Sequence, residues 1–201
     1  DAVTGVLAMD LACSGPVNCV RFCSDGERIV SGDHSNALIV WGVTSGSRLL
    51  QMACNGPVTC VDVSRDDVYL ASGDHNGMLT VWDLKTGEPL REMKCPGSVL
   101  SIHVSVQPFR IATGLQGASD HVVIWDLHDS SAPEPFYSPK TSGGKVVFLP
   151  DGDVIYSDMI DGGSAFLRIR PSSGRELHIG SGQGLMDESR LLVVSADGQC
   201  V

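Results

Sequence analysis

Two Asp-His pairs are the residues in this chain whose types and spacing could do chemistry. Asp33-His34 and Asp74-His75 lie 41 positions apart, each between two short apolar runs. A carboxylate beside an imidazole could ligate a metal ion, titrate near neutral pH or contact a partner. Two histidines do not supply the three or four ligands that a zinc site needs. Three interpretations therefore stay open: a partner contact, a turn residue bonded to nearby backbone, and a metal ligand.

The sequence contains none of the common catalytic motifs. The sequence contains no Gly-x-x-x-x-Gly-Lys-Ser/Thr phosphate loop and no His-Glu-x-x-His motif. Ser181 lies in a glycine-rich run, but it is not the central residue of a Gly-x-Ser-x-Gly elbow. We therefore predict no enzyme activity, no catalytic residue and no cofactor. Six His and many Asp could still meet in space, and a site of that kind stays open.

Most of the seven cysteines follow a repeat, and no Cys-x-x-Cys pair occurs. Cys13, Cys54 and Cys95 are each 41 residues apart, as are Cys19 and Cys60. Because they take equivalent places in successive repeats, we interpret them as structural thiols, with a metal or disulfide role as the alternative. An odd number of free thiols suits a reducing compartment, the cytoplasm or the nucleus.

The composition fits one domain with an acidic surface. The chain has 201 residues and a formal net charge of −10, with 14 Lys+Arg. This charge argues against sequence-independent nucleic-acid binding and favours a basic peptide or protein face as partner. No run approaches the roughly 18 apolar residues of a membrane span. Because the chain begins with Asp1 and lacks a signal-type start, we expect it to come from inside a longer product.

An internal repeat organises the chain. Residues 31–46, SGDHSNALIVWGVTSG, match residues 72–87, SGDHNGMLTVWDLKTG, almost position for position. Each copy has two apolar runs around a polar turn, which predicts a β-hairpin. Trp41, Trp82 and Trp125 end the second run of three copies, at spacings of 41 and 43 residues. We interpret these indoles as packing residues rather than as stacking platforms for nucleic acid or sugar.

A period near 40 residues with Trp-Asp closing the unit resembles the WD-repeat family of β-propellers. The resemblance implies an all-β fold of four-stranded antiparallel blades around a central channel. The expected units are residues 15–54, 56–95, 97–140 and 143–179, with a partial fifth at 181–201. Residues 6–13 are the expected outer strand of a preceding or closing blade. Because the family more often has about seven units, we favour part of a larger propeller over a small closed ring of five.

The resemblance also places the Asp-His pairs on the top face of the channel, in the turn between the second and third strands. His34 and His75 lie seven residues before a Trp, a position that often contacts partners in this family. Asp33 and Asp74 accompany them as candidate contacts. Asp120-His121 has the same letters but lies out of register with Trp125, and we do not count it.

Asn18 and Thr59 are the second candidates, at the entry to the innermost strand near the channel mouth. Leu100 takes the equivalent place in the third unit. The alternative is that these side chains only mark the polar edge of a strand. A ring of contacts that differs between blades would suit recognition of an asymmetric peptide.

The family usually carries a His after the opening Gly of a unit and an Asp six residues before the Trp, which bond to a Ser and the Trp. In this chain the His is replaced by Pro16, Pro57 and Ser98, and the Asp by Ser35, Asn76 and Ser119. We therefore expect the usual network to be absent and apolar contact to carry more of the blade packing.

The resemblance implies a non-catalytic interaction scaffold or adaptor. It would bind a peptide or protein on the top face, as a subunit of a complex, without nucleic acid or membrane. Two alternatives remain: a regulatory propeller domain of a larger multidomain protein, and a propeller enzyme with its site at the central channel.

Overall fold

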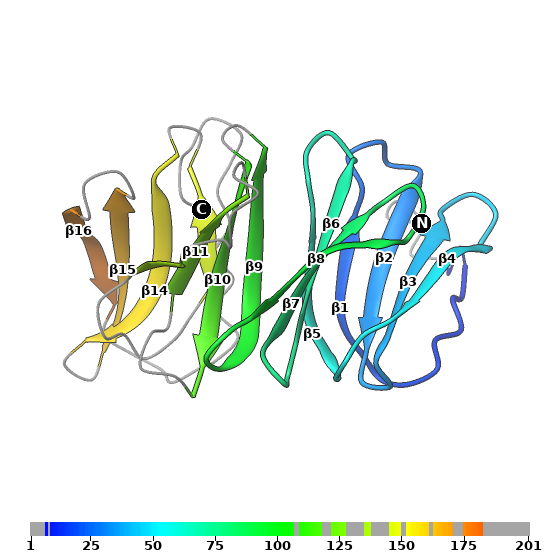
Figure 1. Ribbon diagram of the computed structural model, residues 1–201, viewed down its shortest axis with the longest axis horizontal. Coiled ribbons are helices and arrows are strands. Elements are labelled where there is room, and N and C mark those ends of the chain that lie inside the picture. Colours follow the sequence, from blue (N-terminus) through cyan, green and yellow to red (C-terminus); the bar gives the residue numbers. More distant parts are fainter. Residues whose placement is uncertain are drawn as a thin grey trace.

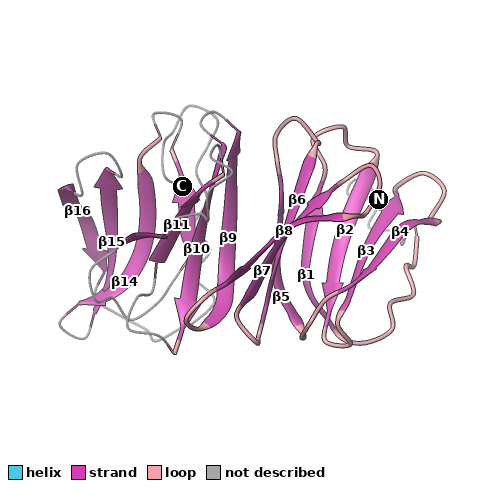
Figure 2. Ribbon diagram, viewed as in Figure 1, coloured by secondary structure: helices cyan, strands magenta, loops and turns pink. Residues whose placement is uncertain are grey.

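The computed structural model describes residues 7, 9–106, 109–117, 122–127, 135–137, 145–149, 152–160, 163–170 and 175–182. Every regular element in these ranges is a β-strand (Figure 2). No helix long and apolar enough to cross a membrane occurs among the described residues. The all-β prediction is confirmed.

Sixteen strands in the described ranges form four antiparallel sheets of four strands, each joined in chain order. The first sheet contains β1 (Val17–Phe22), β2 (Arg28–Asp33), β3 (Ala37–Gly42) and β4 (Arg48–Ala53). The second contains β5 (Val58–Val63), β6 (Tyr69–Asp74), β7 (Met78–Asp83) and β8 (Pro89–Lys94). The third contains β9 (Ser98–Val106), β10 (Phe109–Gln116), β11 (Val122–Asp126) and β12 (Pro135–Tyr137). The fourth contains β13 (Val146–Phe148), β14 (Val154–Ile160), β15 (Gly163–Arg170) and β16 (Arg175–Gly182).

The sheets stand face to face as successive blades (Figure 1). Their first strands are neighbours, because β1 contacts β5, β5 contacts β9, and β9 contacts β13. The third strand of a blade is covered on both faces, so β3 is buried along its whole length and reads as a nearly unbroken apolar run. β4 has mixed exposure and correspondingly mixed polarity. This arrangement is a partial propeller of four-stranded blades, as predicted.

Two turns show why the repeats fold as hairpins. Asn36 and Gly77 occupy the same place between the second and third strands and have φ values of 67° and 79°. Asparagine and glycine are the residues that adopt this left-handed conformation most readily. Both turns lie at the same end of their sheets. We call this end the histidine end. It comprises residues 34–36, 54–57, 75–77 and 95–98.

The predicted loss of the family's polar network is only partly correct. Trp41 Nε1 donates to Ser31 Oγ at 2.8 Å, and Trp82 Nε1 donates to Ser72 Oγ at 2.8 Å. Each serine oxygen also lies 3.8 Å from a thiol, that of Cys13 in the first blade and that of Cys54 in the second.

The third blade has the same hydrogen bond from an indole N–H to a hydroxyl, with threonine in place of serine. Trp125 Nε1 donates to Thr113 Oγ1 at 3.3 Å, and Thr113 bonds the Cys95 side chain. A thiol on the preceding outer segment therefore stands beside the hydroxyl that receives each indole N–H.

Residues 7 and 9–13 are not in a strand, although an outer strand was expected at 6–13. They nevertheless lie where such a strand would pack. Leu11 and Cys13 pack on Ala37, Ile39 and Trp41 of β3. Cys13 lies against Ser31 as Cys54, the residue after β4, lies against Ser72. The segment lacks strand pairing but occupies the place that β4 has against the second blade.

The first blade leaves one face of β1 uncovered. Val20 and Phe22 are exposed, whereas their counterparts on β9, Ile102 and Val104, are buried in a cluster with the second blade. Phe22 is 61% exposed, and its counterpart on β5, Val63, is 9% exposed.

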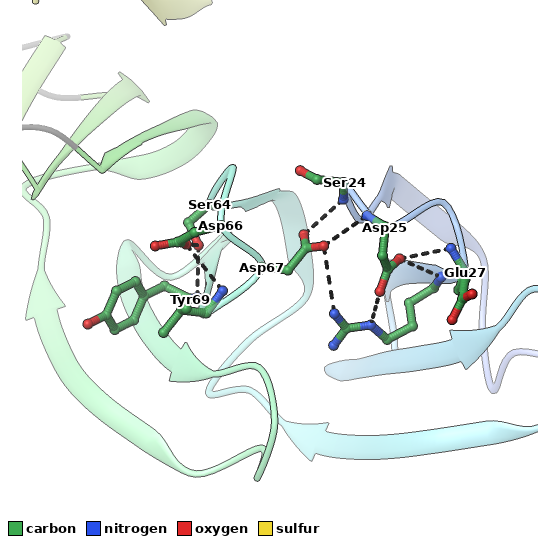
Figure 3. A network of polar contacts seen from close by, with 9 residues as sticks. Ser24, Asp25, Glu27, Ser64, Asp66, Asp67 and Tyr69 are labelled. Carbon is green, nitrogen blue, oxygen red and sulfur yellow. Dashed lines mark hydrogen bonds and ion pairs between the residues drawn. The ribbon is translucent and has the colours of Figure 1, made fainter.

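At the end opposite the histidines, one carboxylate joins the first two blades (Figure 3). Asp67 Oδ1 accepts from the Ser24 N–H at 2.8 Å, and Asp67 Oδ2 accepts from the Asp25 N–H at 2.9 Å. Arg28 Nη2 lies 3.7 Å from Asp67 Oδ2. Asp67 has a φ of 55°, so the backbone holds a left-handed conformation to aim this carboxylate.

Several expectations fall outside the described residues. They are the partial fifth unit beyond Gly182, the pair Asp120-His121, and Ser119 as the replacement for the family's Asp. Ser181 and Gly182 themselves belong to β16 of the fourth blade.

Candidate functional site

The structure separates the members of each Asp-His pair. Asp33 and Asp74 end β2 and β6 and are 1% and 2% exposed. Asp33 Oδ1 accepts from the N–H groups of Ser35 and Ala37, both at 2.9 Å. Asp74 Oδ1 accepts from the Met78 N–H at 2.8 Å. These carboxylates form and hold the turns, and their burial keeps them from touching a partner directly.

The second carboxylate oxygen of each of these aspartates has no such role in the turn. Asp33 Oδ2 and Asp74 Oδ2 are buried and accept no hydrogen bond from the described residues. A Cβ on Gly56 would lie 3.2 Å from Asp74 Oδ2, so the backbone passes close above this oxygen.

The two histidines, in contrast, are exposed on equivalent turns of successive blades. The His34 N–H donates to the Pro16 carbonyl and the His75 N–H to the Pro57 carbonyl, both at 2.9 Å. The backbone is therefore fixed while the imidazoles face solvent. Only His75 has a described side-chain partner, because its Nδ1 lies 3.3 Å from Ser98 Oγ on the next blade.

Asn18 and Thr59 are the extra residues of a β-bulge that occurs at the same place in the first strands of the first two blades. The register slips between Val17 and Cys19 in β1 and between Val58 and Cys60 in β5. A bulge of this kind leaves one residue unpaired and redirects its side chain.

Here the redirected side chains bind the next blade. Asn18 Nδ2 donates to the Val58 carbonyl at 2.8 Å, and Thr59 Oγ1 contacts the Val99 carbonyl in the same way. Thr59 Oγ1 also lies 2.9 Å from the Gly73 carbonyl. Both polar side chains already have partners within the fold. Leu100 takes the corresponding place in β9 and is 40% exposed.

Sequence reasoning missed a second repeated set. Arg21, Asp62 and His103 lie 41 residues apart on β1, β5 and β9, and each reaches toward the next blade. Arg21 Nε pairs with Asp62 Oδ1 at 2.9 Å, and Asp62 Oδ2 accepts from the Val104 N–H at 2.8 Å. His103 Nδ1 accepts from the Phe148 N–H at 3.3 Å. The 41-residue spacing was visible in the sequence, but three different residue types concealed it.

The environment of His103 favours its neutral form. Burial lowers the pKa of His103, and the Arg21 guanidinium lowers it further, while the Asp62 carboxylate opposes both effects. Neutral imidazole is the form that can accept the Phe148 N–H at Nδ1.

The thiols show no sign of activation. Burial raises the pKa of Cys54 to about 11 and that of Cys95 to about 12. Such thiols stay protonated at neutral pH and are poor nucleophiles. The described residues contain no group of three or more His, Cys, Asp or Glu side chains that could hold a metal ion.

Comparison with known families identifies the repeats. The family model for the WD domain, G-beta repeat matches residues 6–42 and 46–83. These two matches cover the first blade with its preceding segment and the first three strands of the second. No curated protein matches the chain.

Solved structures share the fold at low sequence identity. The RRP9 WD40 repeats superpose with a TM-score of 0.69 at 19% identity, covering 85% of this chain and 54% of theirs. The β-propeller domain of Myceliophteria thermophila Cps50 (Swd1) gives 0.77 at 18%, covering 94% and 62%. Kuenenia stuttgartiensis hydrazine synthase gives 0.75 at 16%, covering 96% and 56%. The chain therefore spans between about half and two thirds of these structures, and the likeness shows a common fold.

Proposed function

We propose that this chain, a WD-repeat β-propeller segment, is a non-catalytic protein-interaction scaffold that binds a peptide or protein at its histidine end. The observation that carries the proposal is the exposure of His34 and His75 on rigid turns of adjacent blades. Exposed side chains fixed on a packed framework lose little conformational freedom when a partner binds.

The roles within the site are divided. His34 and His75 contact the partner. Asp33 and Asp74 act as positioning residues, because their buried carboxylates shape the turns that carry the imidazoles. Asn18 and Thr59, first considered as contacts, hold adjacent blades together beneath the site through their bonds to the Val58 and Val99 carbonyls.

The character of the site supports binding rather than catalysis. The thiols near it have raised pKa values, and the buried aspartates are engaged in the turns. The six described cysteines are all free, which supports a reducing location such as the cytoplasm or nucleus.

Partner capture tests the proposal. The chain would be immobilised as wild type and as the His34→Ala, His75→Ala double variant, and captured proteins identified by mass spectrometry. The strongest binder would then be purified and its Kd measured against both forms. We expect the double variant to bind at least tenfold more weakly with an unchanged thermal unfolding midpoint. Equal affinities for the two forms would refute the assignment of this end as the binding face.

A further inference from the structure

The innermost strands of successive blades are joined by side chains. β1, β5, β9 and β13 are each the first strand of a four-stranded sheet and lie at its edge. An edge strand presents backbone N–H groups that its own sheet cannot pair. In the second, third and fourth blades, side chains of one blade accept N–H groups from the innermost strand of the next. The strength of each junction therefore depends on which acceptor the preceding blade supplies.

The same bond is made by different acceptors at two of these junctions. Between the second and third blades, Asp62 Oδ2 accepts from the Val104 N–H at 2.8 Å. Between the third and fourth, His103 Nδ1 accepts from the Phe148 N–H at 3.3 Å. His103 follows Asp62 by 41 residues, so an imidazole takes the place of a carboxylate in the repeat. Histidine side chains ordinarily titrate near pH 6.5 and aspartates near about 4, so only the imidazole changes charge in mild acid.

The fourth blade depends strongly on this junction, because its innermost strand is short. β13 has three residues, whereas β1 and β5 have six each. A short strand makes few hydrogen bonds to its own sheet. Ser101, two residues before His103, accepts from the Val146 N–H at 3.2 Å. Two side chains of β9 therefore hold alternate N–H groups of β13, and His103 is the titratable one.

Protonation of His103 removes the acceptor on which this junction relies. A neutral imidazole carries a free lone pair on one nitrogen, whereas the imidazolium carries N–H groups on both. Nδ1 of the charged ring would then present a donor to the Phe148 N–H, which is itself a donor. The bond is lost, and the Phe148 N–H keeps no partner unless β13 moves away and meets water.

The charged groups around His103 do not cancel this effect. Asp62 of β5 favours the charged ring and Arg21 of β1 opposes it, while burial is the largest influence and keeps the ring neutral. The other elements packed against β9 are β6, β7, β10 and β13. Asp74 of β6 and Asp83 of β7 accept from backbone N–H groups of their own turns. Arg110 of β10 pairs with Asp126 of β11, and β13 has no charged residue, although Lys145 precedes it.

β13 also covers an apolar cluster between the two blades. The buried residues of this cluster are Val146, Phe148, Val154 and Tyr156 of the fourth blade and Ala112, Val122 and Ile124 of the third. Movement of β13 away from β9 would expose part of this cluster to water. The hydrogen bond to His103 therefore controls more surface than its own two atoms.

We propose that the junction between the third and fourth blades is a pH-sensitive switch, in which neutral His103 holds β13 against β9 and protonated His103 releases it. The junction between the second and third blades, where Asp62 supplies the acceptor, stays closed over the same pH range. This inference is independent of the proposed function, whose site lies at the histidine end of the first two blades.

Amide hydrogen exchange of the full chain, followed by NMR at pH 7.5 and 5.5 and corrected for the intrinsic exchange rates, tests the switch. We expect the protection of the Val146 and Phe148 amides to fall severalfold at the lower pH. About tenfold is the upper limit, because a freed imidazole with a pKa near 6.5 gains that much from proton uptake at pH 5.5. His103→Asn is the matched control, since its amide oxygen can accept from the same N–H and does not titrate. Its protection should change less than twofold.

The amide of Val40, in the covered strand β3, reports opening of the whole chain. It should be better protected than Phe148 at both pH values. Equal protection of the two amides would show that β13 opens only when the chain unfolds, and an equal fall in wild type and His103→Asn would show that another group titrates. Either result would overturn the proposal.

A second measurement needs no variant. In a pH titration of the wild-type chain, the Phe148 amide proton resonance should shift with the same midpoint as the His103 imidazole, and the Val104 amide should not shift over that range. A Phe148 resonance that stays in place while His103 titrates would refute the switch.

Discussion

The carboxylate of Asp67 should contribute measurably to stability, because one side chain holds two blades at the end opposite the histidines. It accepts two backbone N–H groups of the neighbouring turn, from Ser24 and Asp25, and stands close to Arg28. Hydrogen bonds to a charged group contribute about 1.5–3 kcal/mol each. The turn is partly open to water, so freed N–H groups can be hydrated and the lower limit applies. Asp67→Ala should then cost about 3 kcal/mol.

Two further variants separate the hydrogen bonds from the backbone strain. Asp67→Asn keeps one acceptor oxygen and should cost about 1–1.5 kcal/mol. Asp67→Gly loses both acceptors but removes about 1 kcal/mol of strain at a φ of 55°, so it should cost about 2 kcal/mol. Gly26 holds the equivalent place in the first blade with a φ of 67°, which shows that the turn accepts glycine.

Urea unfolding followed by tryptophan fluorescence measures these differences. The expected order of stability is wild type, Asn, Gly, then Ala. Glu27→Ala, on the exposed facing turn, is the control and should lie within about 0.5 kcal/mol of wild type. A glycine variant as stable as wild type would show that relieved strain fully offsets the lost hydrogen bonds, and an alanine variant equal to asparagine would show that the acceptor kept by asparagine contributes nothing.

Three other predictions follow from the contacts within and between blades. Ser72→Ala should cost about 1–3 kcal/mol of stability, because it leaves the buried Trp82 N–H without an acceptor. Ser72→Thr keeps a hydroxyl, as Thr113 does in the third blade, and should cost far less; equal losses in urea unfolding would contradict this. Val63→Ala should cost about 2 kcal/mol of stability and Phe22→Ala less than about 1 kcal/mol, because Val63 is buried whereas Phe22, although larger, is exposed. A larger loss for Phe22→Ala would show that this face of β1 is buried in solution. Because burial lowers the pKa of His103, this imidazole takes up its proton at a higher pH in the unfolded chain than in the folded one, so stability holds above about pH 6.5 and falls as the pH drops below it. His103→Gln should therefore reduce the change of the thermal unfolding midpoint between pH 7.5 and 5.5. An equal change in the variant and the wild type would show that His103 is not the cause.

The period and the tryptophans predicted most of the fold, because both report packing that every blade repeats. Trp41 and Trp82 lie near the ends of strands that are covered on both faces, so the apolar pattern had to recur. The segment at residues 9–13 was harder to predict. Its side chains keep the outer-strand packing, but a strand also needs a hydrogen-bonding neighbour, and that neighbour is not part of the residue pattern.

The candidate site was predicted less well, for a reason that Asp33 and Asp74 illustrate. A polar residue at the end of a strand is expected to be exposed, yet a short carboxylate can turn inward and accept hydrogen bonds from the backbone N–H groups of the turn that follows. The spacing contained a hint, since an Asp four residues before the next strand is well placed to do this. Asn18 and Thr59 were misleading in another way, because a bulge in the inner strand cannot be read from alternation and decides where their side chains point.

Equivalent positions therefore separate into two kinds. Where the residues agree, as at Ser31 and Ser72, the side chain serves a contact that each blade needs within its own sheet, the acceptor for the indole N–H. Where they differ while the backbone repeats, two outcomes occur. At Thr59 and Leu100 the polar bond to the next blade is lost with the hydroxyl. At Arg21, Asp62 and His103 the residue types differ, yet each side chain still bonds the next blade, so a change of residue type does not by itself mark a binding surface.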